Sequence, residues 1–360
     1  MSALAREAVR ALPLYAPDVA DCAIDVSDNT NLWGTPPAVL RALRDAPVSA
    51  IGRYPSLYSA PLRDAILRYL ELDGASDMRV VTGCGSDDVI DATMRAFGAP
   101  GDCIAFSVPT FSMIPTFARL NGLEPVAIPL TSRYDVDAER LVHIGAKITY
   151  LCSPNNPTAT SLSRAAIEYV AEHARGVVLL DEAYAEFAPE TFVDLVARYD
   201  RLIVTRTFSK AFGLAGLRVG YGVGSSTTVG MVERARGPYK VNALAERAVL
   251  AALEPTDEGL RWVRLHAALA VENRKRLATE LGNRNLPPLT SSANFVFVPS
   301  ARAALLAHGM RKRGVLVRAF QGLQRDLAEL AGSNGEALRI GVGPWEIMEQ
   351  VLSTLDEVLG

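Results

Sequence analysis

Residues 202–218 read Leu202-Ile-Val-Thr-Arg-Thr-Phe-Ser-Lys210-Ala-Phe-Gly-Leu-Ala-Gly-Leu-Arg218, and this stretch decides the fold. Its apolar, β-branched start is typical of a buried strand. A lysine at the end of such a strand loses hydration, and desolvation lowers the pKa of its ammonium group. Ser209 and Arg218 offer a hydroxyl and a guanidinium, which together suit a phosphate group. For this segment alone, a plain turn with a water-facing lysine stays open, since most lysines are exposed.

The composition is that of an ordinary globular protein, with 49% hydrophobic and 21% charged residues among 360. A net charge of −3 gives no basic surface for nucleic acid or an anionic membrane. The N-terminus mixes acidic and basic residues without an apolar core, and no apolar run reaches membrane-spanning length. The four cysteines lack a CxxC pair, and the four histidines lack HExxH spacing. We therefore expect a cytoplasmic protein with no metal, nucleic-acid or membrane partner.

Between residues 60 and 225, helical patterns alternate with short apolar runs. Continuous apolar strands separated by helices predict an α/β fold with a mostly parallel sheet between helices. The expected strands are residues 79–82, 102–106, 125–128, 148–152, 177–180, 202–205 and 218–221.

After residue 240 the pattern changes to that of a smaller α+β domain. We expect a long helix at 258–281 and strands at 294–298, 315–317 and 338–342. The predicted division is an N-terminal arm at 1–34 that forms part of the small domain, a large cofactor-binding domain at 35–245, and a small C-terminal domain at 246–360.

Polar residues follow several of these strands, and doubly wound sheets bind ligands at that edge. Asp181 follows the run at 177–180 and needs a cationic or hydrogen-bonding partner to stay ionised when buried. The protonated ring nitrogen of pyridoxal phosphate (PLP) is such a partner. Tyr184 can then reach the ring oxygen, while Lys210 supplies the amine for a Schiff base. The alternative for Asp181 is the N-cap of a helix.

Further strand ends offer groups of the same kind. Asn156 precedes a proline that holds its backbone extended, so its amide can point into a cleft. Residues 83–88, Gly-Cys-Gly-Ser-Asp-Asp, open a helix whose backbone N–H groups can bind phosphate, although they match neither a dinucleotide fingerprint nor a P-loop. Phe111 offers a ring face for stacking on a flat cofactor. The alternatives are a plain turn for the Asn156 segment and a core position for Phe111.

The order of these segments resembles that of one family. The chain is similar to the fold-type I PLP-dependent aminotransferases of class I/II, and within them to histidinol-phosphate aminotransferases. The resemblance covers almost the whole chain and rests on Arg53-Tyr54-Pro55, Ser153-Pro-Asn-Asn-Pro-Thr158, Asp181-Glu-Ala-Tyr-Ala-Glu-Phe187, Thr207 to Arg218, and Gly237-Pro-Tyr-Lys-Val-Asn242. It implies a PLP enzyme that works as a homodimer.

The resemblance also implies roles at the matching positions. Lys210 would hold the cofactor and move the proton, Asp181 would pair with the ring nitrogen, and Tyr184 would complete the catalytic set. The implied cofactor-binding residues, with Tyr54 supplied by a second subunit, are Gly85, Ser86, Asp87, Phe111, Asn156, Asp181, Tyr184, Thr207, Ser209, Lys210, Arg218 and Tyr54. The implied substrate-binding residues are Tyr15, Asn31, Arg318 and Arg339.

The implied activity is a ping-pong transfer of the amino group of histidinol phosphate to 2-oxoglutarate. Two arginines suit a substrate that carries a phosphate ester. The chain departs from the family pattern at three places: Phe111 stands where tyrosine is usual, Ala159 where glycine is usual, and Asn29-Thr-Asn31-Leu32 replaces Asn-Glu-Asn-Pro. The resemblance places the last of these near the substrate, so the substrate stays open. The alternatives are an aromatic amino acid aminotransferase, a PLP lyase like threonine-phosphate decarboxylase, and a non-catalytic regulator or nucleotide binder. A regulator would need a DNA-binding segment longer than residues 1–30.

Overall fold

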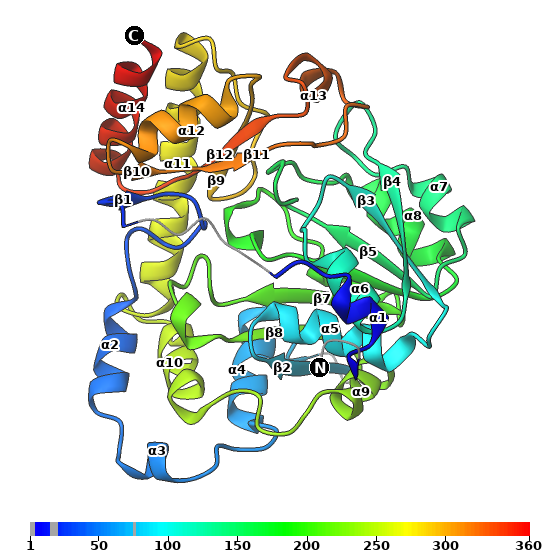
Figure 1. Ribbon diagram of the computed structural model, residues 1–360. Coiled ribbons are helices and arrows are strands. Elements are labelled where there is room, and N and C mark those ends of the chain that lie inside the picture. The colour runs from blue at the N-terminus through cyan, green and yellow to red at the C-terminus, as the bar shows by residue number, and fades with distance from the viewer. Residues whose placement is uncertain (1–3, 15–20, 75–76) are drawn as a thin grey trace.

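The computed structural model describes residues 4–14, 21–74 and 77–360, and its centre is a seven-stranded sheet (Figure 1). The strands lie in the order β2-β8-β7-β6-β5-β3-β4. Their bounds are Met78–Gly83 (β2), Cys103–Val108 (β3), Glu124–Pro129 (β4), Ile148–Cys152 (β5), Val177–Asp181 (β6), Leu202–Thr207 (β7) and Gly220–Ser225 (β8). Strands β3 to β7 are parallel, whereas β8 is antiparallel to both of its neighbours. The predicted α/β fold with a mostly parallel sheet is confirmed.

Each central strand contributes to two hydrophobic cores, because successive side chains point to opposite faces of a sheet. In β6, Val178 and Leu180 belong to one core and Leu179 to the other. The helices of the first core include α4 (Ala60–Tyr69), α8 (Arg164–His173) and α10 (Ala243–Leu253), and those of the second include α5 (Ser86–Phe97), α6 (Ile114–Leu120) and α9 (Ser226–Ala235). This double cover explains why the strand sequences are apolar throughout rather than alternating.

A second, smaller group of strands lies beside the large sheet (Figure 1, upper left). It consists of the antiparallel sheet β11-β12-β9 and the parallel pair β1–β10. The bounds are Ile24–Asp25 (β1), Phe295–Pro299 (β9), Val315–Leu316 (β10), Arg318–Phe320 (β11) and Ala337–Gly341 (β12). Because β1 pairs with β10, part of the N-terminal arm lies against the C-terminal part of the chain.

The remaining elements connect or cover these sheets. The helices are α1 (Glu7–Arg10), α2 (Pro37–Arg44), α3 (Ser49–Gly52), α7 (Ala138–His143), α11 (Leu260–Asn283), α12 (Ala303–Arg311), α13 (Ala328–Gly332) and α14 (Trp345–Leu359), with short 3-10 turns η2 (Ala185–Phe187), η3 (Val193–Ala197) and η4 (Ala215–Leu217). The predicted boundary at 245 and 246 falls inside α10, so the chain continues as one helix across it. Within the described ranges, no helix combines the length and the apolar character that crossing a membrane requires.

Candidate active site

A cavity of about 490 Å³ opens at the carboxyl ends of β5, β6 and β7. The last residue of each of these strands, Cys152, Asp181 and Thr207, lines it. The predicted site residues that meet in this cavity are Ser86, Asp87, Phe111, Asn156, Asp181, Tyr184, Thr207, Ser209, Lys210, Arg218, Arg318 and Arg339. Of the others, Gly85, Asn31 and Tyr54 do not line it, and Tyr15 lies outside the described residues.

Lys210 lies just beyond the end of β7 and is half-buried. Its Nζ donates a hydrogen bond of 2.9 Å to the main-chain oxygen of Asp28 and lies 5.9 Å from the ring centroid of Tyr184. Burial, followed by the positive charge of Arg339, lowers the pKa of Lys210 to about 8. With this pKa a larger fraction of the amine is neutral near physiological pH than in an ordinary lysine, and the neutral form is the nucleophile.

Asp181 is the last residue of β6 and is only 4% exposed. Its Oδ2 accepts a hydrogen bond of 2.9 Å from the Tyr150 hydroxyl, and its Oδ1 accepts one of 3.1 Å from the Ala183 N–H. Burial raises the pKa of Asp181 to about 7 against the opposing effect of the Tyr150 bond. A cationic ligand beside this carboxyl would favour its ionised form.

Tyr184 and Asn156 are oriented by hydrogen bonds across the cavity. Asn29 Nδ2 donates to the Tyr184 hydroxyl at 3.1 Å, and Arg339 Nη1 donates to Asn156 Oδ1 at 2.7 Å. Burial raises the pKa of Tyr184 to about 12, so its hydroxyl keeps the proton and can donate it in a hydrogen bond.

Asn29 lines the cavity, whereas the predicted Asn31 does not. The backbone of Asn29 has a φ of +59°, in the left-handed region that asparagine tolerates. Asn31 Nδ2 donates to the Ala211 carbonyl at 2.8 Å, and Asn31 Oδ1 accepts from the Trp33 N–H at 2.9 Å. Asn31 therefore supports the lysine segment from outside the cavity.

The N-terminus of α5 faces the cavity, because Ser86 and Asp87 of its first turn line it. No side chain of the described residues caps this helix end, so its first N–H groups are available to an anion. Gly85 precedes the helix with a φ of +81°, and a Cβ there would lie 2.7 Å from Arg218 Nη2. Arg218 Nη1 donates to Ser209 Oγ at 3.4 Å, and Arg218 Nη2 lies 3.7 Å from Asp87 Oδ2. Helix N–H groups, a hydroxyl and a guanidinium are groups that suit an anion.

The glycine-rich turn is held in place by a distant lysine. Asp88 Oδ2 accepts from the Cys84 N–H at 3.0 Å, and Asp88 Oδ1 accepts from Lys240 Nζ at 2.8 Å. Neither Asp88 nor Lys240 was singled out from the sequence, because their pairing depends on tertiary structure.

Arg318 in β11 and Arg339 in β12 are direct cross-strand partners, and both line the cavity. Like charges placed opposite each other in a sheet repel. Arg339 donates in addition to Asn156 and to the main-chain oxygen of Ser27. An anion bound between the two guanidinium groups would offset their repulsion, so the pair suits an anionic substrate group.

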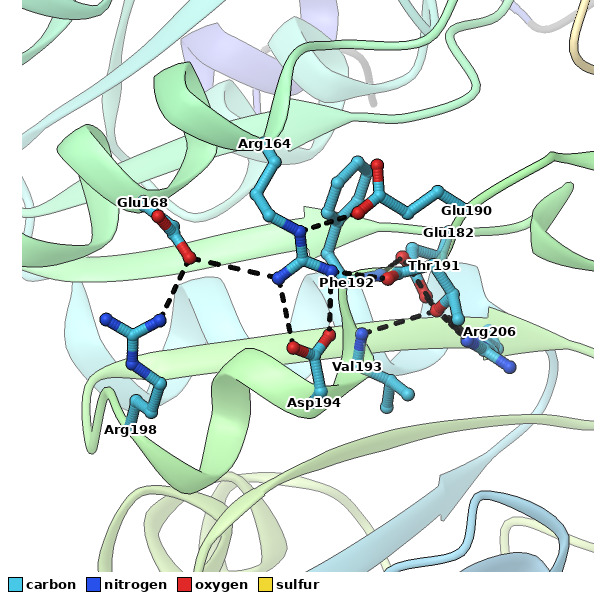
Figure 2. Close-up of polar contacts among 10 residues, drawn as sticks. All are labelled: Arg164, Glu168, Glu182, Glu190, Thr191, Phe192, Val193, Asp194, Arg198 and Arg206. Carbon is cyan, nitrogen blue, oxygen red and sulfur yellow. Dashed lines mark hydrogen bonds and ion pairs between the residues drawn. The ribbon is translucent and has the colours of Figure 1, made fainter.

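A buried network holds the ends of β6 and β7 together (Figure 2). Glu182, directly after Asp181, accepts hydrogen bonds of 3.0 and 2.8 Å from Nε and Nη2 of Arg206 in β7. It also accepts from the Thr191 hydroxyl and, at 2.6 Å, from the Phe192 N–H. Glu182 and Arg206 are 1% and 5% exposed, so either charge would be buried and unpaired without the other. We infer that this pair fixes the position of the Asp181 segment.

Comparison with known proteins agrees with this geometry. The profile of the family described as aminotransferase class I and II matches residues 23–355. A histidinol-phosphate aminotransferase of Roseiflexus castenholzii is 37% identical over 351 residues, 93% of this chain and 89% of that protein. An aromatic amino acid aminotransferase of Corynebacterium glutamicum is 34% identical over 345 residues, 93% of this chain and 96% of that protein. The solved structure of histidinol-phosphate aminotransferase from Sinorhizobium meliloti, in complex with pyridoxal-5'-phosphate, shares the fold with a TM-score of 0.84 at 24% identity, covering 98% of this chain and 96% of that one.

Proposed function

Because the chain belongs to the aminotransferase class I and II family, whose members are PLP enzymes, we propose that it moves the amino group of histidinol phosphate to 2-oxoglutarate. The observation that carries this proposal is the cross-strand pair of Arg318 and Arg339 in the same cavity as Lys210. Histidinol phosphate carries a phosphate where an amino acid carries a carboxylate, and a dianion interacts more strongly with two guanidinium groups. Relatives named for this activity support the same substrate.

The cavity offers suitable partners for both ends of PLP. In this proposal the N-terminus of α5, Ser209 and Arg218 hold the phosphate, and Phe111 stacks on the ring. Asp181 bonds the ring nitrogen, which fits its buried carboxyl and raised pKa because a cation there stabilises the ionised form. When bound, PLP supplies an electron sink for the electrons of the substrate C–H bond.

Lys210 is the proposed proton carrier. A base works best when its pKa lies near the working pH, and the pKa of Lys210 is lowered to about 8. The Asp28 carbonyl orients the amine, and the Tyr184 ring lies beside it. Lys210 would accept the proton from the substrate carbon that bears the amino group and would then donate it to a carbon of the cofactor.

We also propose a homodimer in which Tyr54 enters the cavity of the second subunit. Tyr54 is 84% exposed and stacks on Tyr239 with ring centroids 4.9 Å apart. Nearby, Val48 and Ile51 are 86% and 77% exposed. A cluster of exposed apolar side chains of this kind is typical of a protein interface.

A single-turnover measurement on the PLP-loaded enzyme tests the substrate. Histidinol phosphate is expected to convert the cofactor absorbance to that of the aminated form faster than phenylalanine does. Arg318→Gln should slow this reaction by about tenfold or more, because a hydrogen bond to a charged group contributes about 1.5–3 kcal/mol. Arg302→Gln, an exposed arginine outside the cavity, is the matched control and should react normally.

Other outcomes would select another activity. A faster reaction with phenylalanine would contradict the proposal and favour aromatic amino acid transfer, the second candidate, which the Corynebacterium glutamicum relative supports. Release of carbon dioxide from phosphothreonine without amino transfer would favour a lyase.

A further inference from the structure

A second cavity, of about 780 Å³, lies next to the segment that carries Asp181 and Tyr184. The residues that follow Tyr184, numbers 185–189, form one wall, and α11 forms another. Thr191 and Arg206, which bind Glu182 in Figure 2, also line it. Among the residues that the structure describes, none lines both this cavity and the one that contains Lys210.

The wall formed by α11 carries a row of apolar side chains, interrupted by the exposed Arg264, and is polar at its C-terminal end. Leu260, Val263, Ala267 and Val271 line the cavity, and spacings of three and four place them on one face of the helix. Arg274 follows on the same helix and lines the cavity beyond them. The serines and threonine at 290–292 line it as well. A ligand in this cavity would therefore meet an alkyl surface and a cationic end.

Arg274 is a buried cation without a carboxylate partner. It is 7% exposed, and its Nη1 donates to the main-chain oxygens of Phe187 and Ala293 at 3.2 and 2.8 Å. Among the described residues no acidic side chain forms an ion pair with it. Burial alone lowers the pKa of Arg274 to about 10, with no charged neighbour opposing the effect. The two carbonyl oxygens satisfy donors of Arg274 without neutralising its charge, so an anionic ligand would stabilise this site.

The other charges around the cavity leave this preference in place. Arg206 is neutralised by Glu182. Glu186 also lines the cavity and accepts a bond of 3.0 Å from the Tyr69 hydroxyl, and burial raises the pKa of its carboxyl, which favours the uncharged form. Arg264 and Lys275 add exposed positive charge, and Glu71 adds one exposed negative charge.

We propose that this second cavity binds a small organic carboxylate, with its charged head at Arg274 and its apolar body along α11. This site is separate from the proposed active site, and its occupancy does not depend on which amino donor the enzyme uses. The occupant would contact residues 185–189, which directly follow Tyr184 of the cofactor cavity.

Calorimetric titration of the PLP-loaded enzyme with hexanoate tests the proposal, because hexanoate has neither an amino nor a 2-oxo group to react. A saturable site that persists in Arg339→Gln is expected, since the pair of Arg318 and Arg339 in the cofactor cavity can also attract the carboxylate. Arg274→Gln should weaken binding by about tenfold or more, since a charged hydrogen bond is lost. Ala268→Phe, at an exposed position of α11 that lines the cavity, should weaken it by filling the space. If Arg274→Gln does not fold, the Ala268→Phe variant still tests the proposal.

Two controls locate the site. Arg276→Gln changes a neighbouring arginine whose guanidinium lies over the Trp345 ring, at 3.6 Å, and outside the cavity, so hexanoate should bind normally. Arg339→Gln removes a cation from the cofactor cavity, and the affinity of the site at Arg274 should stay unchanged in this variant. Absence of saturable binding, unchanged affinity in Ala268→Phe, or loss of binding in Arg339→Gln would each overturn the proposal.

Discussion

At the scale of single residues, burial prepares the two central ionisable groups for a cofactor. It lowers the pKa of Lys210 to about 8 and raises that of Asp181 to about 7, so both are poised near neutrality. These two residues could be singled out from the sequence because each follows a continuous apolar run that must be a buried strand. Asn29 could not be separated from Asn31, because the backbone turn between them decides which side chain faces the cavity.

Asp181→Asn should change the pH dependence of stability in the cofactor-free protein. The folded pKa of about 7 lies above the ordinary value, so the contribution of the Asp181 carboxyl to wild-type stability is highest below about pH 4 and is lost as pH rises to about 7. Asparagine cannot ionise, so the variant does not lose this contribution. Its free energy of unfolding should therefore rise relative to that of the wild type across this pH window, by at most about 4 kcal/mol. Urea unfolding at about pH 4.5 and pH 8 measures the difference. A difference that does not change with pH would contradict the burial argument.

At the scale of elements, the positions of the strands could be predicted well from the sequence, but the way in which neighbouring strands pair could be predicted less well. Seven apolar runs with the right length indicated the large sheet, but nothing local shows that β8 runs antiparallel to β2 and β7. The residue pairs that position the site could not be predicted from local sequence either. Arg318 opposite Arg339, Asp88 with Lys240, and Glu182 with Arg206 all join residues far apart in sequence, so only the folded register brings them together.

Gly85→Ala should damage the anion site at the start of α5. Its Cβ would lie 2.7 Å from Arg218 Nη2, and its φ of +81° is unfavourable for alanine. The affinity of the cofactor-free protein for PLP is expected to fall about tenfold or more, measured by fluorescence titration. Gly101→Ala is the control, since its φ of +90° imposes similar backbone strain while no atom lies within 4 Å of the added Cβ. Equal PLP affinity in the two variants would show that Arg218 is not displaced.

At the scale of the whole molecule, the chain leaves a group of apolar side chains exposed around α2, α3 and the segment after α3. Leu40, Val48, Ile51 and Tyr54 are all more than half exposed, and Tyr239 stacks on Tyr54. This surface was not evident from composition, since exposure is set by folding rather than by residue type. The resemblance of residues 53–55 to a family motif was the only sequence signal for a dimer.

Ile51→Asp should convert the proposed dimer to a monomer. A charge at the centre of an apolar interface would be buried without a partner, so association is expected to weaken strongly. Light scattering after size-exclusion chromatography gives the mass of each species. Leu305→Asp, at a 60% exposed leucine of α12, is the matched control and should remain dimeric. A monomeric wild-type protein would contradict the proposal.

The assignment of the cofactor site is tested most directly by identifying the residue that carries PLP. The protein loaded with PLP and reduced with borohydride should carry the phosphopyridoxyl group on one peptide, at Lys210, when it is digested and examined by mass spectrometry. Lys210 is the expected site because it alone among the lysines lines the cavity between Asp181 and Arg218. Labelling of Lys240 or another lysine instead, or no labelling at all, would contradict the assignment of this cavity as the PLP site.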